Sequence, residues 1–219
     1  MAKQLIIWGA GGHGKVVRDV ALSAAQFEDL VFFDDDPVKD GTTFCDCPVL
    51  AGLHHLDQLA GSAFMAAVGD NRIRARCYGQ AINSGLTPAV LIHRSAVISP
   101  SAMIASGTVV MAGVVVNAGA TISENCIINT GAVVEHDCII DAHVHISPRV
   151  ALGGGVSVGE FAHVGIGAIA LPGARVGERS TVGAGAVVVK DAPADCTVVG
   201  IPAKVLRDAR SNRTGVSIP

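Results

Sequence analysis

Aliphatic residues recur at every sixth position through the second half of the chain. Seventeen consecutive hexads begin on such a residue, and the series runs without insertion from Ile92 to Val188, with Ala170 its weakest member. The fifth position of each hexad is small or Val, as at Ala120 and Cys126. Positions two to four are rich in Gly, Asn, Asp, Glu, Ser and Pro. This pattern predicts short strands joined by tight turns.

The alternation of side chains along a strand indicates how a chain with this six-residue period folds. The fifth position and the next first position face inward, and the sixth position between them faces outward. Three hexads close one triangular coil of 18 residues, and coils stack at about 4.8 Å. An amphipathic helix is excluded because a six-residue step places successive apolar residues on opposite faces, and a β-sandwich would have longer, irregular turn spacing. Residues 89–206 are therefore predicted to form a parallel β-helix, with Cys126 and Cys138 in its core.

Residues 1–88 follow a different pattern. The segment QLIIW (4–8) is predicted to be a buried strand, Gly9–Gly14 has the form GxGxxG, and residues 15–24 have helical periodicity. Further strands are expected at 30–33 and 63–68, and a second helix at 72–84. This is a βαβαβ half of a dinucleotide-binding (Rossmann-like) α/β fold, too short for a complete NAD site.

Candidate ligand-binding groups follow the predicted strands of this domain. The glycine loop would bring backbone N–H groups close to a phosphate at the start of the helix. The second strand ends in Asp34 and Asp35, whose carboxylates could hold a ribose or a base, and the third is followed by Gly69 and Asp70. We expect a nucleotide or a nucleotide sugar here, and a glycine turn that binds nothing stays the alternative.

Composition and charge narrow the classes further. Hydrophobic residues are 50% of the chain and aromatic residues 4%, so the core must be aliphatic. A net charge of −3 without a basic stripe gives no reason to expect nucleic acid. We expect no membrane insertion, because no run of about 18 residues is uninterruptedly apolar, and a cytoplasmic location, because no signal-peptide layout is present. The six cysteines lack CxxC spacing and are expected to be reduced thiols. The polar tail 207–219 has no assigned role.

Four segments carry a resemblance to a known family: GAGGHGKVV, GDNRIR, NTGAVVEHDCII and VGIPAK. With them the chain resembles the NeuD/PglD-like sugar-nucleotide acetyltransferases of bacterial glycan synthesis. The resemblance implies a left-handed coil, acetyl-CoA as co-substrate, and a homotrimer with acetyl-CoA sites between neighbouring β-helices. It implies N-acetylation of a UDP-linked 4-amino-4,6-dideoxy sugar. A GDP-linked amino sugar, and O-acetylation of a sialic acid or a serine-type acceptor, stay open.

The same resemblance implies roles for individual residues. His136 matches the catalytic base and Asp137 the acid that orients it, which is Glu in the bacillosamine-pathway type. The positions that match the acetyl-CoA site are His145, Gly154, Ile166 and Ala184. The positions that match the nucleotide-sugar site are Gly11, Gly12, His13, Asp34, Asp35 and Asp70.

The 18-residue coil adds geometric expectations. His136 lies at the third position of its hexad and should point outward at a turn, with Gly154 one coil above it. A glycine there would leave space over the base and offer an N–H to an oxyanion. His145 is half a coil from His136, so we expect the two to meet between subunits of a trimer and not within one. His163, one coil after His145, should stack on it.

Four other interpretations remain to be weighed. The γ-class carbonic anhydrases share this helix, but their metal-binding histidines include an i, i+5 pair that this chain lacks, so no metal is expected. A non-catalytic scaffold is opposed by the Glu-His-Asp turn and the triple glycine Gly153–Gly155. A nucleotide-dependent oxidoreductase would need a second half-domain. His136 as an ordinary solvated histidine also stays an alternative.

Overall fold

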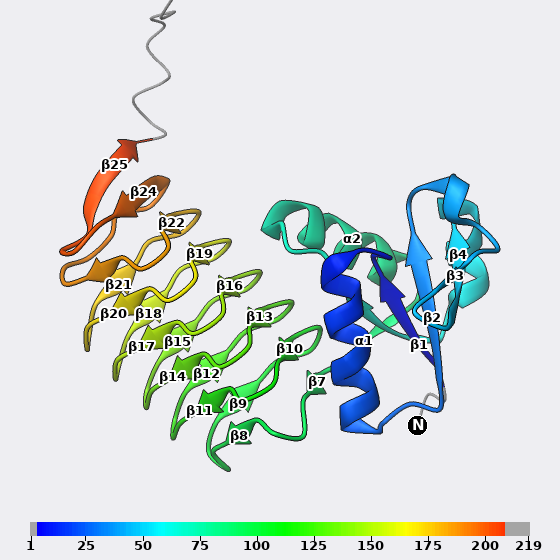
Figure 1. Cartoon of the computed structure of the whole chain (residues 1–219), viewed down its shortest axis with the longest axis horizontal. Coiled ribbons are helices and arrows are strands. Elements are labelled where there is room, and N and C mark those ends of the chain that lie inside the picture. Colours follow the sequence, from blue (N-terminus) through cyan, green and yellow to red (C-terminus); the bar gives the residue numbers. More distant parts are fainter. Residues whose placement is uncertain (1–3, 209–219) are drawn as a thin grey trace, which may run out of the picture.

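The computed structural model describes residues 4–208, which form two parts lying side by side (Figure 1). An N-terminal α/β domain is joined to a parallel β-helix, and helix α1 (Gly12–Ala24) lies between the sheet and the first coil. The backbone N–H of Arg94 donates to the hydroxyl of Ser23 at this junction (3.1 Å). The two predicted fold classes are both confirmed.

The predicted strands and helices of the N-terminal domain are present, with small shifts. Strands β1 (Gln4–Trp8), β2 (Asp29–Asp34) and β5 (Ala63–Ala66) run parallel at the centre of the sheet. Helix α1 begins at Gly12, three residues earlier than predicted, and α2 spans Asn71–Asn83. Strand β2 pairs with one edge of β1, and β5 pairs with the other. The carboxyl ends of β1 and β5 therefore flank the point where the strand order reverses, which is where ligands usually bind in sheets of this kind.

The sheet has six strands, not the three that the sequence predicted. Its order is β3-β4-β2-β1-β5-β6. The additional elements are β3 (Thr43–Phe44), β4 (Cys47–Ala51), β6 (Thr87–Pro88) and the 3₁₀ turns η1 (Pro37–Lys39) and η2 (Leu53–Leu59). These elements are two to seven residues long, which is too short for a periodic pattern to identify.

The β-helix contains a two-residue strand for each predicted hexad, and it is left-handed. The first face is made of β7 (Leu91–Ile92), β10 (Val109–Val110), β13 (Ile127–Ile128), β16 (His145–Ile146), β19 (His163–Val164) and β22 (Thr181–Val182). The second face is made of β8 (Val97–Ile98), β11 (Val115–Val116), β14 (Val133–Val134), β17 (Ala151–Leu152), β20 (Ile169–Ala170) and β23 (Val187–Val188). The third face is made of β9 (Met103–Ile104), β12 (Thr121–Ile122), β15 (Ile139–Ile140), β18 (Ser157–Val158) and β21 (Arg175–Val176).

Two further strands continue the first face beyond the last hexad. Strand β24 (Cys196–Val199) pairs in parallel with β22, and β25 (Lys204–Asp208) pairs antiparallel with β24. The predicted tail 207–219 thus overlaps the last two residues of β25, and the rest of it lies outside the described residues. The division into 1–88, 89–206 and 207–219 stays a prediction.

The interior of the coil is filled as the hexad pattern predicts. Inward residues such as Ile140 and Val158 are fully buried, and register pairs each strand with its counterpart 18 residues away. Cys126 and Cys138 are 1% and 0% exposed and fill the core as expected. Burial raises the pKa of both thiols. All six cysteines are free thiols.

The outward residues of the first face change character along the helix. Leu91, Val109 and Ile127 are outward yet 0% exposed, because the N-terminal domain covers this end of the face. His145 and His163 follow at the same register and are only partly buried. The change from aliphatic to histidine therefore marks the edge of the covering domain.

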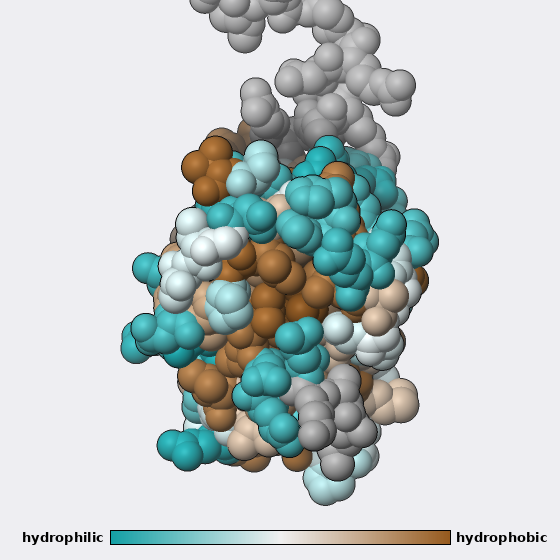
Figure 2. Space-filling view, turned by 90° about the vertical axis from the view of Figure 1, so that its right-hand side faces the viewer, coloured by the Kyte–Doolittle hydropathy of each residue, from teal (hydrophilic) through white to brown (hydrophobic). Residues whose placement is uncertain are grey.

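The end of the molecule formed by the N-terminal domain is mixed in character. Figure 2 shows hydrophobic residues gathered at its centre with hydrophilic residues around them. Exposed aliphatic side chains of this domain include Val38 and Leu53. Within residues 4–208, no helix has the length and apolar character needed to cross a membrane.

Candidate active site

His136 lies on the corner between the second and third faces, in the turn after β14. Its Nδ1 is 2.9 Å from Oδ2 of Asp137. Asp137 has a positive φ of 58°, the left-handed turn conformation that these corners need. The His136 side chain is 64% exposed. His136 thus points outward at a turn with an acid beside it, as the sequence predicted, and its role as the base stays a prediction.

The Asp137 carboxylate determines how His136 can act. A carboxylate can only accept, so Nδ1 carries the proton of the neutral ring and Nε2 keeps its lone pair. The hydrogen bond from His136 to Asp137 raises the pKa of the imidazole, and the charges of Asp137 and Glu135 act in the same direction. The ring is therefore oriented, more basic than an isolated histidine, and open to solvent on its Nε2 side.

Gly154 lies directly over His136 in the next coil, as the 18-residue repeat predicted. The N–H of Gly155 donates to the carbonyl of His136 (2.8 Å), which joins the two turns. A Cβ added to Gly154 would lie 2.5 Å from Nε2 of His136. Within residues 4–208 the N–H of Gly154 makes no hydrogen bond. The glycine thus makes room for the His136 ring and keeps a free N–H beside it, and its role toward an oxyanion stays a prediction.

A groove of about 530 Å³ runs over the first face to its corner with the second face. Three of the four expected acetyl-CoA residues, His145, Ile166 and Ala184, line it together. The fourth, Gly154, is on the other corner of the second face. The groove residues are Asn129, His145, Ser147, Pro148, His163, Gly165, Ile166, Thr181, Val182, Gly183 and Ala184.

Two stacked histidines form the floor of this groove. The rings of His145 and His163 are 4.7 Å apart and 4° from parallel, which confirms the predicted stacking. His145 donates from Nδ1 to the carbonyl of Gly69 (3.3 Å) and accepts at Nε2 from the amide of Asn129 (3.2 Å). Burial, followed by the neighbouring charges, lowers the pKa of His145 to about 3. His145 is therefore neutral over the physiological range.

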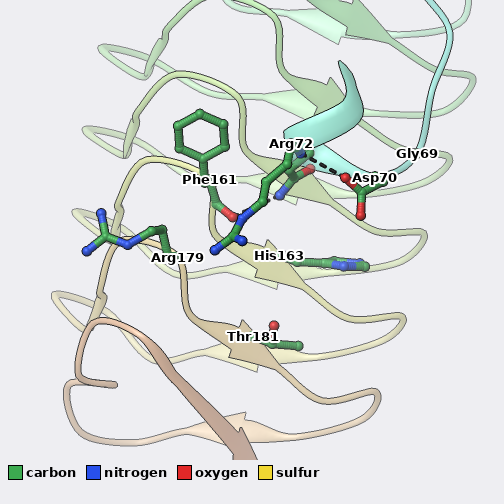
Figure 3. Close-up of a pocket in the computed structure, with 8 residues that line it drawn as sticks. Gly69, Asp70, Arg72, Phe161, His163, Arg179 and Thr181 are labelled. Atoms are coloured by element: carbon green, nitrogen blue, oxygen red, sulfur yellow. Dashed lines mark hydrogen bonds between the residues drawn. The ribbon is translucent and has the colours of Figure 1, made fainter. Parts of the chain in front are cut away.

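A second cavity of about 260 Å³ adjoins the groove (Figure 3). His163 and Thr181 line both spaces, so the two are continuous along the first face. Figure 3 shows the loop before α2 on one side of this cavity, and Phe161 and Arg179 on the other. Its lining residues are Gly69, Asp70, Asn71, Arg72, Phe161, His163, Arg179 and Thr181.

The glycine loop offers open backbone at the sheet edge. A Cβ at Gly11 or Gly12 would meet nothing within 4 Å, whereas one at Gly14 would overlap the carbonyl oxygen of Gly9. Gly14 is thus required for packing of α1 on β1, and Gly11 and Gly12 leave room for a ligand at the helix N-terminus. Both expected roles of the motif are compatible with this geometry.

His13 lies between the glycine loop and the groove. Its ring lies in the first turn of α1, 6.4 Å from the ring of His145. Its Nε2 is buried without a hydrogen-bond partner among the described residues. Burial, and then the charge of Arg74, lowers the pKa of His13 to about 4. A neutral imidazole with an unsatisfied nitrogen is suited to contact a polar ligand group.

The three expected carboxylates have structural partners. Asp34 accepts from the N–H of Ala10 (2.9 Å) and from Lys39 (2.8 Å), so its pKa is lowered although burial acts in the opposite direction. Asp35 accepts from the indole of Trp8 (2.9 Å). Asp70 caps α2 and accepts from two backbone N–H groups. Asp34 therefore shapes the glycine loop, while Asp35 and Asp70 remain largely exposed to a ligand.

Within one chain the expected site residues fall into two groups on different corners. His136, Asp137 and Gly154 form one group, and His145, Ile166 and Ala184 lie with His13 and the loop before α2 in the other. Sequence reasoning missed Asn129 and Ser147, which bond the stacked histidines. Both occupy the second hexad position, 18 residues apart, so a search for columns of polar residues would have found them.

Metal ligation was tested against the same geometry. In residues 4–208, no group of three or more His, Cys, Asp or Glu side chains is arranged to hold a metal ion. His145 and His163, the closest ring pair on the groove floor, already bond Gly69, Asn129 and Ser147 through their nitrogens.

A left-handed hexapeptide β-helix with a histidine–carboxylate corner and a separate groove is the architecture expected of an acyltransferase with this repeat. Residues 4–81 match the family described as the PglD N-terminal domain. Together with the solved structures below, this shows that the chain belongs to the PglD/NeuD-like sugar acetyltransferases and is an enzyme of that family.

Three solved structures cover nearly the whole chain. A variant of perosamine N-acetyltransferase from Caulobacter crescentus, in complex with CoA and GDP-perosamine, is 40% identical over 94% of this chain and 97% of its own, with a TM-score of 0.88. The acetyltransferase domain of PglB from Neisseria gonorrhoeae, in complex with acetyl coenzyme A, is 42% identical over 94% and 100%, with a TM-score of 0.89. WeeI from Acinetobacter baumannii AYE is 27% identical over 92% and 99%, with a TM-score of 0.85.

Proposed function

We propose that this enzyme transfers the acetyl group of acetyl-CoA to the amino group of a nucleotide-linked amino-deoxy sugar. One observation carries the proposal: a solvent-accessible imidazole, oriented by a carboxylate, lies against a glycine of the next coil whose missing side chain makes room for the ring. A scaffold has no need of such a pair. The relatives with bound CoA or acetyl coenzyme A support an acyl-CoA donor.

The proposed reaction is direct transfer. His136 accepts a proton at Nε2 as the amine attacks the thioester carbonyl, and Asp137 stabilises the resulting imidazolium. The N–H of Gly154 is a candidate donor to the tetrahedral oxyanion, and CoA thiolate leaves. An acyl-enzyme is not proposed, because the described cysteines near the groove are buried core residues with raised pKa values.

The acceptor is assigned to the N-terminal domain. Gly11, Gly12 and His13 with Asp35 and Asp70 line the sheet edge where nucleotides bind in folds of this kind. We infer a UDP-linked 4-amino-4,6-dideoxy sugar from the motif resemblance. A GDP-linked amino sugar is the second candidate, favoured by the relative that was crystallised with GDP-perosamine. O-acetylation of a sugar or serine is the remaining alternative.

A homotrimer would complete the site. The outward residues of the second face are all aliphatic and none is buried, in contrast to the mixed third face. They are Val97, Val115, Val133, Ala151, Ile169 and Val187. This face lies between the His136 corner and the Ile166–Ala184 corner. Packing of three such faces around an axis would place His136 of one chain beside the groove of the next, which supports the proposed trimer.

The central test is His136→Ala. Removing the base should lower turnover by about 10²–10⁴-fold, with the oligomer unchanged in size-exclusion chromatography. Thiol release from acetyl-CoA in the presence of acceptor measures turnover. Near-normal activity in this variant would contradict the proposal.

The acceptor is tested by a panel of sugar nucleotides. UDP- and GDP-linked amino sugars and their hydroxyl counterparts are compared for thermal shift and for thiol release. Turnover only with amino sugars supports N-transfer, and the preferred base separates the UDP and GDP alternatives. Turnover with hydroxyl sugars alone would replace the proposal by O-acetylation.

A further inference from the structure

Arg74 is a buried cation at the junction of the two parts. It lies in the second turn of α2 and is 1% exposed. It makes no ion pair within residues 4–208. Burial lowers the pKa of Arg74 to about 10, so the guanidinium remains charged at neutral pH. A buried charge without a counter-ion is expensive and must be held by well-placed hydrogen bonds.

The guanidinium is held by oxygens from both parts of the molecule. On the N-terminal side it donates to the carbonyls of Val68 (3.2 Å) and Gly69 (3.3 Å) and to Oδ1 of Asn71 (2.9 Å). On the β-helix it donates to the carbonyls of Asn125, His143 and Val144, at 3.0, 2.8 and 3.3 Å respectively. All five N–H donors of an arginine have a fixed geometry, so these contacts set the position of one part against the other.

Asn71 adds further hydrogen bonds between the two parts. While Oδ1 accepts from Arg74, the amide of Asn71 donates to the carbonyls of Phe161 (2.9 Å) and Ala162 (3.0 Å). The loop Val68–Asn71 is thus bonded to three successive coils. This loop carries Asp70 and forms one wall of the cavity in Figure 3.

The carbonyl of Gly69 connects the hydrogen bonds of Arg74 to the groove that His145 lines. The oxygen of Gly69 accepts from Arg74 and also from Nδ1 of His145. Because a carbonyl can only accept, this contact requires the proton of neutral His145 to be on Nδ1, which leaves Nε2 as an acceptor toward Asn129.

We propose that Arg74 is a positioning residue that fixes the loop Val68–Asn71 on the β-helix and, through the Gly69 carbonyl, holds His145 in its Nδ1–H tautomer. The proposal rests on the proposed function for its kinetic consequence, because the loop and His145 border the acceptor and donor sites respectively. The tautomer itself is a property of the protein alone.

The charges around His145 act in the same sense. His13 from α1, His163 from β19 and Arg74 from α2 all disfavour protonation of His145, and only the Gly69 carbonyl favours it. Arg74 also disfavours protonation of His13 and His163, while Asp70 acts in the opposite direction on His163. Burial is the main cause of the low pKa of His145, and Arg74 acts in the same direction, so the ring is neutral, as the tautomer assignment requires.

The test compares the whole protein with Arg74→Lys, Arg74→Met and the control Arg175→Met. Arg175 is an exposed arginine on the third face. Imidazole ¹⁵N shifts at pH 7, assigned with His145→Gln, report the tautomer. We expect Nδ1–H in the wild type and the control, a mixture with Nε2–H in Arg74→Met, and an intermediate population in Arg74→Lys. Folding is checked by circular dichroism.

The kinetic arm separates positioning from folding. Loss of a hydrogen bond to a charged group should raise KM for the sugar nucleotide about tenfold or more in Arg74→Met. The acetyl-CoA KM should rise by less than the sugar-nucleotide KM, because only the His145 contact changes while the Ile166–Ala184 corner keeps its contacts. Arg74→Lys should recover part of the loss.

Two results would overturn the proposal. One is Nε2–H as the main tautomer of His145 in the wild type. The other is a folded Arg74→Met, or a folded Arg74→Lys if the methionine variant does not fold, with unchanged tautomer population and KM. The NMR arm needs no substrate, so a failure of the proposed function would leave this result readable.

Discussion

At the scale of single residues, the chemistry depends on two neighbours of His136. Asp137 accepts from Nδ1, and Gly154 leaves the space over Nε2. The first orients the imidazole and raises its pKa, and the second makes room for the ring, which leaves Nε2 available for the proposed proton transfer. Neither contributes to the core, since both are at a turn on the surface.

The pH dependence tests the first neighbour. The general base must be neutral, so kcat/KM falls as pH drops through the pKa of His136, which Asp137 raises. In Asp137→Asn the carboxylate is lost, the pKa of His136 falls, and the acidic limb moves to lower pH. Turnover at the optimum should fall by about tenfold or more because the ring is less well oriented. An NMR titration of His136 checks the pKa directly, and an unchanged limb would contradict the assignment.

Gly154→Ala tests the second neighbour. The new methyl would lie 2.5 Å from Nε2, and the exposed His136 ring can move away at little cost in stability. Turnover should therefore fall by about 10-fold or more, while the free energy of unfolding changes by less than about 1 kcal/mol. Gly79→Ala, on the surface of α2 with nothing within 4 Å, is the control. Equal activity of both variants would remove Gly154 from the site.

At the scale of elements, the hexad pattern was sufficient to predict the strands of the β-helix, because each two-residue strand specifies its own inward and outward side chains. Every predicted hexad has a strand, and the stacking of Gly154 over His136 and of His163 over His145 follows from the coil length. The hairpin β3–β4 and the short turns were missed, since their stability comes from pairing with β2 and not from a local pattern.

Strand β15 offers a matched pair of isoleucines that tests the assignment of inward and outward side chains. Ile140 faces inward and is 0% exposed, whereas Ile139 faces outward and is 52% exposed. Ile140→Ala should cost about 2–5 kcal/mol of unfolding free energy through the cavity it leaves, and Ile139→Ala about 0.5 kcal/mol or less. Denaturant unfolding measures both. Similar losses would mean that the third face is covered in the native protein.

At the scale of the whole molecule, the two groups of site residues lie at opposite borders of the second face. Within one chain the proposed base, His136, therefore has no groove beside it. An aliphatic face between them is what association of identical chains requires, because burying it removes apolar surface from water.

Ile169 and Ile139 provide the test of assembly. Both are exposed isoleucines, at 42% on the second face and 52% on the third. Ile169→Lys should dissociate the proposed trimer and abolish turnover, because a buried charge at the interface is unpaired, while Ile139→Lys should leave both unchanged. Light scattering and thiol release report the two properties.

Mixing His136→Ala with His145→Ala chains should restore part of the activity, and no recovery would exclude a shared site.

The sequence alone determined the β-helix, its register and the place of His136, because these depend on contacts repeated every 18 residues. It also indicated the glycine loop and the two helices of the first domain. Only the tertiary structure decided which part of the first face is covered, how Arg74 bonds both parts, and which groups contact the two nitrogens of His145. These features depend on how two independent patterns dock, and the residues involved, such as Arg74 and Asn71, have no periodicity that distinguishes them from surface residues.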